Sequence, residues 1–499
     1  MKIISVAIFL PVLLFLKHTY AQSKPNPKEA WISVNLVSDS SSKPINFVRY
    51  DHYVSRFSSK EYTIIKKGGD GRYDIHFRNV DHPFYFNLYR DLNVIGSENN
   101  ILNMYLVEPG DNVQIDIFGF KMVLFKKRYI CTFSGQGAAK YQCRNEIDQN
   151  LVSYNSTEES GLYNALTNDG KFISNGYYDK CNLIINSTLN GWKKQMSKSS
   201  YDILRLDFFS QNESGRMESA HMTGKLLSPN NITWTVINKY RSILEMEEKG
   251  FLNNSKEICA YYPQYLLDKG AMGGIYRTGN SKRIESKYMD SFFESITSKY
   301  KGVLCDRVLT LLIFSQFPRW MDEAYASKIT KQIKTGYCRD DLKIYVDPKR
   351  KGMEAYNFSL PDSNEHVVKL SDMKGKVVLV DFWYTGCMGC AQYYRVALKQ
   401  LEQEFKDNDQ VRFVSVSIDT LKATWLDAVH SDTYTSLSAI NLYTNGKGES
   451  SDVNKYYKID GYPTPLLIDK NGKIFSSSEN DLRDKEKLKK LIEEAIAMQ

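Results

Sequence analysis

Cys387 and Cys390 are separated by two residues, and their type and spacing make them the residues of this chain best suited to chemistry. Two thiols this close in sequence can close into a disulfide and open again, and the attacking species in that exchange is the thiolate. The apolar run Val377–Trp383 lies shortly before them and predicts a buried strand. We therefore expect the cysteines where this strand turns into a helix, with Cys387 in the first helical turn.

The two sulfurs should have different roles. Unpaired backbone N–H groups and the helix dipole stabilise an anion at a helix N-terminus, which favours the thiolate of a cysteine there. Cys387 is therefore predicted to be the exposed nucleophile that attacks a substrate disulfide. Cys390, about one helical turn further on, would resolve the mixed disulfide and leave a Cys387–Cys390 disulfide. This redox-active pair would need no other cofactor.

Asp381 is a carboxylate inside the apolar strand. Burying a charge is costly unless the charge is paired or used, so we interpret Asp381 as part of the same site. The alternative is an ordinary strand aspartate whose carboxylate is satisfied by solvent or by the backbone.

Residues 353–499 carry two motifs, the strand followed by Cys-Met-Gly-Cys and, at residues 461–469, Gly-Tyr-Pro-Thr-Pro-Leu-Leu-Ile-Asp. Around them, residues 358–362 and 370–376 look like a hairpin and residues 411–419 like the next strand. These features together resemble the thioredoxin-like thiol–disulfide oxidoreductases of the TlpA/ResA type. The resemblance implies a C-terminal α/β thioredoxin-like fold and action on the disulfides of other proteins.

The resemblance also implies roles for the residues around the cysteines. Asp381 would lie beneath Cys390 and assist its proton transfer, and Pro463 would be the family's cis-proline beside the cysteines. The residues expected to contact substrate are Trp383, Tyr462 and Thr464, and those expected to tune the redox potential are Met388 and Gly389. The alternatives are a plain turn proline at position 463 and simple core packing by Trp383.

The chain departs from the family pattern in two places. Met388-Gly389 replaces the usual Gly-Pro or His-containing pair between the cysteines, and the helix that follows lacks the Glu and the kink-forming Pro common in TlpA-type sequences. The dithiol chemistry should survive both changes, whereas the redox potential and the substrate groove would differ.

The chain before this domain divides into a β-rich part and a helical part. Short apolar or alternating runs predict an all-β, sandwich-like accessory domain over residues 22–137. Apolar stripes with helical spacing, among them one that follows Pro229, predict a helical region over residues 138–345. Both parts resemble accessory domains of secreted Bacteroidetes proteins, so the chain is predicted to be multidomain.

Three connecting segments also carry expectations. Asn253-Asn254-Ser255 is predicted to be a loop within the helical region. The charge-rich residues 339–352 predict a boundary before the redox domain at residues 346–499, with a basic docking patch as the alternative. Residues 431–451 form a longer loop than a minimal thioredoxin needs, and no role for it follows from the sequence.

Residues 1–21 have the features of a secretory signal peptide. Lys2 supplies a positive charge, residues 3–16 are apolar, and Ala21 ends a cleavage site. The apolar run is shorter than the roughly 20 residues of a spanning helix, although an uncleaved membrane anchor is the alternative. We therefore predict a mature chain in the periplasm or cell envelope, where disulfides persist.

The chain has eight cysteines, and two of them form the Cys-x-x-Cys pair, which leaves six. An even number permits up to three structural disulfides, and buried free thiols are an equally open alternative. The six are Cys131, Cys143, Cys181, Cys259, Cys305 and Cys338.

Charge and composition restrict the partners. The net charge of +8 comes from 66 Lys and Arg against 58 Asp and Glu, and no basic run is interleaved with aromatic residues. Nucleic acid is therefore not expected to bind. The expected partners are disulfide-containing proteins, a membrane electron donor, and a second copy of the chain bound through the N-terminal region to form a homodimer.

Three other functions compete with a thiol–disulfide oxidoreductase. A peroxiredoxin would carry Pro-x-x-x-Thr-x-x before its reactive cysteine, but Val380 and Tyr384 occupy the Pro and Thr positions. A zinc site would need two more ligands, and no paired histidines lie nearby. The third is a non-enzymatic extracytoplasmic binding protein with a vestigial redox domain, whose cysteines would never cycle between dithiol and disulfide.

Overall fold

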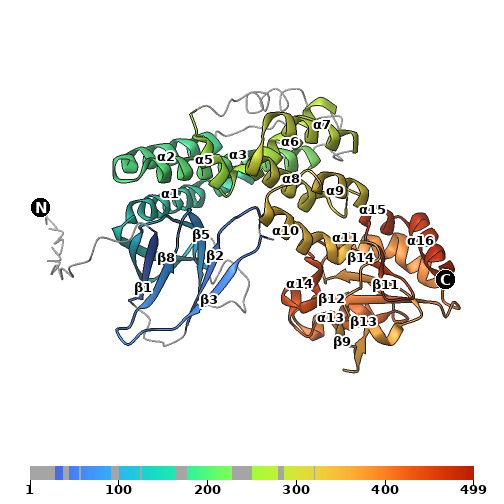
Figure 1. The fold of residues 1–499 in the computed structure, drawn as a ribbon. Helices are drawn as coiled ribbons and strands as arrows, with labels where there is room; N and C mark the ends of the chain where they lie inside the picture. The colour runs from blue at the N-terminus through green and yellow to red at the C-terminus, as the bar shows by residue number, and fades with distance from the viewer. Residues whose placement is uncertain are drawn as a thin grey trace, which may run out of the picture.

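The fold is that of a computed structural model of the 499-residue chain. The structure describes residues 28–37, 44–55, 58–90, 100–123, 126–163, 177–226, 250–278, 286–319 and 321–498. The predicted signal peptide and the predicted stripe after Pro229 lie outside these residues. Figure 1 shows a β-rich part near the N-terminus, helices that bridge across the molecule, and an α/β part at the C-terminus.

Within the described residues, the N-terminal part forms two four-stranded sheets with the orders β4-β1-β7-β8 and β3-β2-β5-β6. Phe77 of β4 and Phe47 of β2 come from different sheets, and their ring centroids lie 5.3 Å apart in a shared core. The sheets therefore pack face to face, which confirms the predicted sandwich. The strands are β1 (Glu29–Leu36), β2 (Ile45–Tyr50), β3 (Glu61–Ile65), β4 (Tyr73–Arg78), β5 (Phe84–Tyr89), β6 (Asn100–Val107), β7 (Asn112–Val123) and β8 (Lys126–Gln136).

Strand β2 shows no clean alternation of apolar and polar residues, because both of its faces are covered. Phe47 points into the sandwich core. Val48, its neighbour, packs with Ile203 of helix α3 in a second cluster. A strand buried on both sides reads as a continuous apolar run, and the sandwich is thereby joined to the helical part.

The described part of the central region is helical, as predicted. Met289, Phe292 and Ile296 lie on one buried face of α7, and Leu309 and Leu312 are buried in α8. No helix among the described residues combines the length and apolarity needed to cross a membrane. The helices are α1 (Ala138–Tyr163), α2 (Tyr177–Trp192), α3 (Lys198–Leu226), α5 (Asn253–Ile258), α6 (Tyr262–Thr278), α7 (Ser286–Lys299), α8 (Gly302–Gln316), α9 (Glu323–Thr330) and α10 (Gly336–Val346).

The prediction of a loop at Asn253-Asn254-Ser255 is wrong, because these residues form the first turn of α5. Ser255 is buried, and its carbonyl accepts a hydrogen bond from the N–H of Cys259 at 2.8 Å. Ile258, at the end of α5, packs against the sandwich cluster that contains Tyr85. Tertiary packing here overrides the weak loop preference of Asn and Ser.

The charge-rich residues 339–352 begin within α10, continue through a short 3-10 helix, Asp347–Lys349, and end in a turn at Gly352. Lys349 is buried, and its Nζ lies 4.1 Å from the ring centroid of Tyr345. Burial lowers the pKa of Lys349 to about 8. Because this lysine faces inward, the segment does not present all its charges as a docking patch. The N–H of Gly352 donates to Ile474 of the C-terminal sheet at 2.8 Å.

The C-terminal domain is built on a five-stranded sheet with the order β13-β12-β11-β14-β15. Strands β11, β12 and β13 are parallel, and β14 and β15 are antiparallel to their neighbours. Its strands are β9 (Ser359–Pro361), β10 (Val367–Lys369), β11 (Val377–Trp383), β12 (Val411–Ser417), β13 (Ile440–Tyr443), β14 (Thr464–Ile468) and β15 (Ile474–Ser476). Its helices are α11 (Met388–Tyr393), α12 (Lys399–Glu404), α13 (Lys422–His430), α14 (Asp452–Tyr457), α15 (Glu479–Leu482) and α16 (Lys485–Ala497).

The hairpin before this sheet differs in its second arm from the prediction. Strand β9 pairs with β10, and Leu360 lies opposite Val368. The predicted arm at residues 370–376 instead begins with a short 3-10 helix, Leu370–Met373. Leu370 and Met373 are buried in the core cluster beneath the hairpin, which explains their apolar character.

Strand β11 is buried on both faces, and the direction of each side chain decides what Asp381 can reach. Val380 and Phe382 point into the cluster beneath α14 and the hairpin. Leu379 points to the opposite face, where it packs with Tyr393 of α11 and Leu488 of α16. Asp381 shares the face of Leu379, because side chains two apart on a strand point the same way. The strand therefore directs Asp381 toward α11.

All six cysteines outside the Cys387–Cys390 pair are free and buried in the structure. We predict that the oxidised, denatured chain reacts with six equivalents of an alkylating reagent, and with eight after reduction. The measurement is intact mass after alkylation in denaturant. A count of four, two or zero before reduction would show one, two or three further disulfides and contradict the structure.

Candidate active site

Cys387 caps the N-terminus of helix α11 and is joined to Cys390 by a disulfide, with Cα atoms 5.3 Å apart. The sulfur of Cys387 accepts a hydrogen bond from the backbone N–H of Cys390 at 3.1 Å. An N-cap acceptor satisfies a backbone donor that has no partner within the helix. The same N–H would stabilise the Cys387 thiolate once the disulfide opens.

The prediction that Cys387 is exposed is wrong for this disulfide form. Cys387 is only 5% exposed and Cys390 only 1%. Both sulfurs pack in an apolar cluster with Trp425 and Tyr443, which covers them. Met388, in contrast, is 85% exposed and marks the open side of the pair. The turn that carries the cysteines is therefore open to solvent on the side of Met388.

Pro463 lies directly beside the helical turn that carries the cysteines. The Tyr462–Pro463 peptide bond is cis. A Cβ atom placed on Gly389 would lie 3.5 Å from Cδ of Pro463 and 3.7 Å from the carbonyl oxygen of Tyr462. The small residue between the cysteines therefore lets the proline loop approach the Cys-x-x-Cys turn closely.

Tyr462 and Thr464, on either side of this proline, differ in what they offer a substrate. The hydroxyl of Tyr462 accepts a hydrogen bond from Asn454 at 2.7 Å, and its ring meets Tyr384 edge to face at 5.5 Å. Thr464 is buried, and its hydroxyl donates to the carbonyl of Gly461 at 2.7 Å. A substrate contact by the side chain of Thr464 is therefore not supported, because that side chain closes its own loop.

Trp383 is fully buried, so the prediction that it contacts substrate is also not supported. Its indole N–H donates to the hydroxyl of Ser415 at 2.6 Å, and its ring stacks on Tyr434 with centroids 5.0 Å apart. Buried indoles usually find such a polar partner. The structure thus favours the packing role for Trp383.

Asp381 is buried, and its Oδ1 has no hydrogen-bond partner among the described residues. Burial raises the pKa of Asp381 to about 8, because the ionised carboxylate has lost its water. Glu402 and Glu479 also favour the protonated form, and Arg483 opposes them. A carboxyl that titrates near neutral pH can both hold and accept a proton under physiological conditions.

A family model for thioredoxin-like proteins matches residues 375–474. The chain is 29% identical over 143 residues to Thioredoxin-like protein YneN of Bacillus subtilis, covering 28% of this chain and 79% of YneN. It is 33% identical over 140 residues to Thiol-disulfide oxidoreductase ResA of Oceanobacillus iheyensis, covering 27% of this chain and 66% of that ResA.

The C-terminal domain belongs to the thioredoxin-like thiol–disulfide oxidoreductases of the TlpA/ResA type. Among solved structures, the chain is similar to the thioredoxin domain of a thiol–disulfide oxidoreductase from Bacteroides vulgatus, with 29% sequence identity and a TM-score of 0.26. The match covers 29% of this chain and 98% of the Bacteroides domain. The chain spans just under two thirds of the length of the Oceanobacillus ResA.

Two residues that the sequence did not assign hold the turn before Cys387 in the thioredoxin-like domain. Asp419, two residues after the end of β12, accepts hydrogen bonds from the N–H of Thr385 at 3.0 Å and from its hydroxyl at 2.8 Å. The hydroxyl of Tyr434 accepts from the N–H of Gly386 at 2.9 Å. Gly386 has a φ of +94°, which favours glycine. Because β12 is the parallel neighbour of β11, the residues that follow the two strands lie close together. This adjacency could have indicated that Asp419 reaches the turn before Cys387.

The prediction of one long loop at residues 431–451 is wrong, because this segment contains strand β13 and a short 3-10 helix, Gly448–Ser450. Tyr434 gives a role to the loop that remains, residues 431–439. Its ring covers Trp383, as described above, and Asp432 in the same loop accepts a hydrogen bond from Tyr394 at 2.5 Å. Tyr394 begins a π-helical segment, Tyr394–Leu398, which directly follows α11. The loop therefore packs against both the strand and the helix that carry the site.

Arg483 is the third residue that the sequence missed in the thioredoxin-like domain. Its guanidinium donates to the carbonyl oxygen of Pro463 and to the carboxylate of Glu479. It is also the cation that most lowers the pKa of Asp381. Arg483 thus connects the cis-proline loop to the buried acid. It lies far along the chain from both, so no local pattern could have indicated it.

We predict that Arg483→Met shifts the titration of Asp381 upward, by about one pH unit, because a nearby positive charge is lost. The measurement is the pH dependence of the rate at which Cys390 resolves a mixed disulfide. Arg483→Lys, which keeps the charge, should leave the midpoint close to that of the unmodified chain. Equal midpoints in the Met and Lys variants would show that Arg483 does not act on Asp381 through its charge.

Proposed function

We propose that this chain is an extracytoplasmic thiol–disulfide oxidoreductase that reduces or reshuffles protein disulfides through Cys387-Met388-Gly389-Cys390. The observation that carries the proposal is the Cys387–Cys390 disulfide at the N-terminus of α11, next to Pro463. The relatives named as thiol–disulfide oxidoreductases support the same chemistry.

In the first step, the Cys387 thiolate attacks one sulfur of the substrate disulfide. A Cys387–substrate S–S bond forms while the substrate S–S bond breaks, and the departing thiolate takes a proton from solvent. In the second step, Cys390 loses its proton and attacks the Cys387 sulfur. The second substrate thiol then leaves and is protonated. The substrate gains two electrons and two protons, and the enzyme is left as the Cys387–Cys390 disulfide.

Asp381 would be the proton acceptor for Cys390 in the second step. It lies on the face of β11 that meets α11, and its free oxygen has no competing partner among the described residues. A thiol attacks far more slowly than a thiolate, so a buried base speeds this step. The electrons and protons stay on the two cysteines and the substrate, and the proposal involves no other cofactor.

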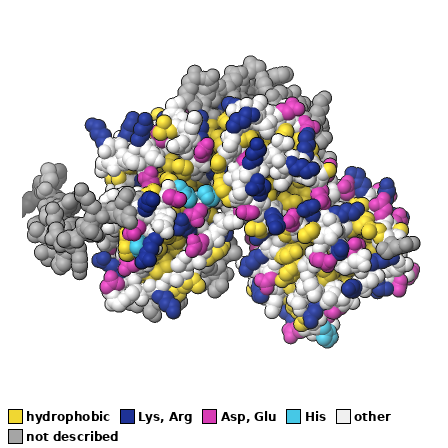
Figure 2. All heavy atoms as spheres, viewed as in Figure 1, with side chains coloured by type: hydrophobic (Ala, Val, Ile, Leu, Met, Phe, Trp, Pro, Cys, Tyr) yellow, Lys and Arg dark blue, Asp and Glu magenta, His cyan; other side chains and the backbone are white. Residues whose placement is uncertain are grey.

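Several partners follow from this role as proposals. The chain would act in the periplasm or cell envelope, consistent with the predicted signal peptide, and a membrane dithiol donor would return it to the reduced state. Homodimerisation through the N-terminal region would favour isomerase activity. Figure 2 shows positive and negative side chains interspersed over the visible face, which is unlike the basic surface of a nucleic-acid-binding protein.

A single-turnover reaction with insulin tests the proposal. The chain without residues 1–21 is reduced, freed of reductant, and mixed with excess insulin as the disulfide probe. We expect each chain to lose two thiols, from eight to six by alkylation and mass, while insulin gains two. An unchanged count of eight thiols, with insulin intact, would overturn the proposed function.

A further inference from the structure

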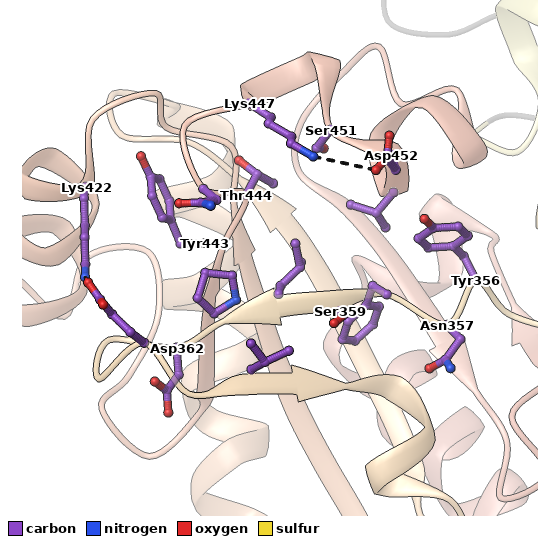
Figure 3. Close-up of a pocket in the computed structure, with 17 residues that line it drawn as sticks. Tyr356, Asn357, Ser359, Asp362, Lys422, Tyr443, Thr444, Lys447, Ser451 and Asp452 are labelled. Atoms are coloured by element: carbon purple, nitrogen blue, oxygen red, sulfur yellow. Dashed lines mark hydrogen bonds and ion pairs between the residues drawn. The ribbon is translucent and has the colours of Figure 1, made fainter.

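A cavity of about 540 Å³ lies in the thioredoxin-like domain, between the hairpin strand β9, the end of β13 and helix α14. Figure 3 shows its walls, with Ser359 and Asp362 on one side and Tyr443, Thr444 and Ser451 on the other. Leu360 and Val453 add an apolar floor. Neither cysteine of the redox pair lines this cavity.

Two hydroxyl groups at the wall lack partners. Thr444 is 1% exposed and Ser451 is 2% exposed. Neither Thr444 Oγ1 nor Ser451 Oγ has a hydrogen-bond partner within the part of the chain that the structure describes. Leaving a buried polar group without a hydrogen-bond partner destabilises the folded chain. Both residues line the cavity, although the two oxygens are themselves covered. A ligand with donors and acceptors would satisfy them after a rotation of each side chain toward the cavity.

The charges of the cavity are already paired, which argues against an anionic ligand. Lys422 lies 2.6 Å from the carboxylate of Glu365, and Lys447 lies 3.8 Å from that of Asp452. Asp362 adds a further negative charge. A phosphate or sulfate would therefore have to displace a carboxylate from each lysine before it could bind.

The aromatic residues of the cavity are unsuited to stacking on a sugar ring. Tyr443 is buried, its ring stacks on Trp425 at 5.0 Å, and its hydroxyl donates to Thr420. The ring of Tyr356 packs against Tyr456 with centroids 4.9 Å apart. The remaining features are neutral hydroxyl groups and an apolar floor, a combination that suits a polypeptide segment.

The cavity and the redox pair lie at the same edge of the sheet. Cys387 follows the end of β11 and Thr444 follows the end of β13, and β11, β12 and β13 are parallel. The N–H of Thr444 donates to Ser417, whose hydroxyl donates to Asp419 at 2.9 Å. Asp419 in turn holds the turn before Cys387. A polypeptide that reacts at Cys387 could thus extend along this edge into the cavity.

The β-strands that border the cavity also suit a polypeptide. Among the described residues, β13 is the outermost strand of its sheet, and β9 pairs on one side only, with β10. Edge strands offer backbone donors and acceptors that an extended chain can use.

We propose that this cavity binds the stretch of substrate polypeptide that flanks the disulfide under attack. The inference rests on the proposed function and deepens it, because it gives the enzyme a second contact with its substrate besides the redox pair. The unpartnered hydroxyls of Thr444 and Ser451 would bond to the backbone of that stretch. A long substrate would then be held more tightly than a short one of the same reactivity.

The test uses the Cys390→Ser variant of the chain, in which a mixed disulfide at Cys387 persists. Two neutral peptides with a central cysteine, one of three residues and one of fifteen, are supplied as mixed disulfides with thionitrobenzoate. Cys387 attacks the peptide sulfur, and coloured thionitrobenzoate leaves. In the fifteen-residue peptide, seven residues flank the cysteine on each side, and seven residues can extend about 23 Å from Cys387. Exchange of each bound peptide with glutathione then gives its relative stability.

We expect the long peptide to be favoured about tenfold over the short one in this exchange, the gain of one or two hydrogen bonds. Adding Thr444→Val and Ser451→Ala should remove most of this preference, whereas Thr297→Val, in the distant helix α7, should keep it. Thermal unfolding shows whether each variant is folded. In the variant that keeps Thr444 and Ser451, backbone hydrogen exchange of the cavity segments, residues 356–362 and 443–453, should slow when the long peptide is bound. It should not slow when the short peptide is bound.

The outcomes separate the two proposals. Equal exchange equilibria for both peptides, with no protection of the cavity segments, would overturn the cavity proposal and leave the redox function intact. If the long peptide still slows hydrogen exchange of the cavity segments when both Thr444→Val and Ser451→Ala are present, the role of the two hydroxyls is overturned. If Cys387 releases thionitrobenzoate from neither peptide, the proposed function itself fails, and the cavity proposal fails with it.

Discussion

Replacing Cys387 with alanine is expected to abolish insulin reduction, with a loss of at least about 1000-fold, because Cys387 is the thiol that attacks the substrate disulfide and Cys390 has no second thiol beside it to resolve a mixed disulfide. The structure supports this role, since the Cys387 sulfur is the one that receives the N–H of Cys390 at the start of α11. Cys390→Ser should stop turnover to a similar extent but should accumulate a chain bound covalently to insulin through Cys387. Non-reducing gel electrophoresis and mass spectrometry detect this species.

Cys181→Ala is the matched control, because Cys181 is another buried thiol, in helix α2, and is not part of a disulfide. It should retain nearly all of the activity. Trapping of insulin on Cys390 in the Cys387→Ala variant, at the rate of the unmodified chain, would reverse the assigned roles. Loss of activity in the Cys181 variant alone would place the chemistry elsewhere in the molecule.

Replacing Asp381 with asparagine is expected to slow the resolving step about 100-fold at pH 8, the typical contribution of a positioned base. In the unmodified chain this rate should rise with pH and level off above about 8, the pKa to which burial raises Asp381. The Asp381→Asn variant should show no rise at that midpoint. Stopped-flow decay of the mixed disulfide, measured from pH 5 to pH 10, gives both profiles.

Glu402 supplies the control for this profile, because it is a second carboxyl whose pKa burial raises, to about 7. It lines the same small cavity as Asp381. Glu402→Gln should keep the rise in rate, with a slightly lower midpoint, because Glu402 is one of the groups that raise the pKa of Asp381. If the rise disappears in Glu402→Gln and survives in Asp381→Asn, the base is Glu402.

The raised pKa of Asp381 also has a consequence for stability. The ordinary pKa of this group is 3.8, and the folded chain holds the proton up to about pH 8. Because the folded state binds this proton more tightly than the unfolded state, the free energy of unfolding falls as pH rises between these values. Asp381→Asn should therefore melt at a higher temperature than the unmodified chain at pH 8, and at nearly the same temperature near pH 4.

The strand and the cysteine pair could be predicted because the signals are local. Val377–Trp383 is a continuous apolar run, and the structure forms β11 over the same residues. Cys387 and Cys390 follow at a spacing that has few other uses. The sandwich was predictable for a similar reason, since its inner residues alternate with outer ones along strands such as β1.

The orientation of individual side chains could not be predicted, because it depends on partners far away in the chain. Trp383 turns inward because Ser415 accepts its N–H and Tyr434 covers its ring. The role of Arg483 depends on α15 bringing it to Pro463. None of these pairs leaves a pattern in one sequence.

The most direct test of the account is the reduction potential of the Cys387–Cys390 pair. The chain without residues 1–21 is equilibrated in glutathione and dithiothreitol buffers of defined potential, and free thiols are trapped by alkylation and counted by mass. The account predicts a reversible two-electron transition between six and eight thiols, near the roughly −270 mV of thioredoxin for a reductase or the roughly −180 mV of an isomerase. A value near −120 mV, typical of a disulfide-forming oxidant, would contradict the direction of electron flow. No reversible transition at all would contradict the redox function.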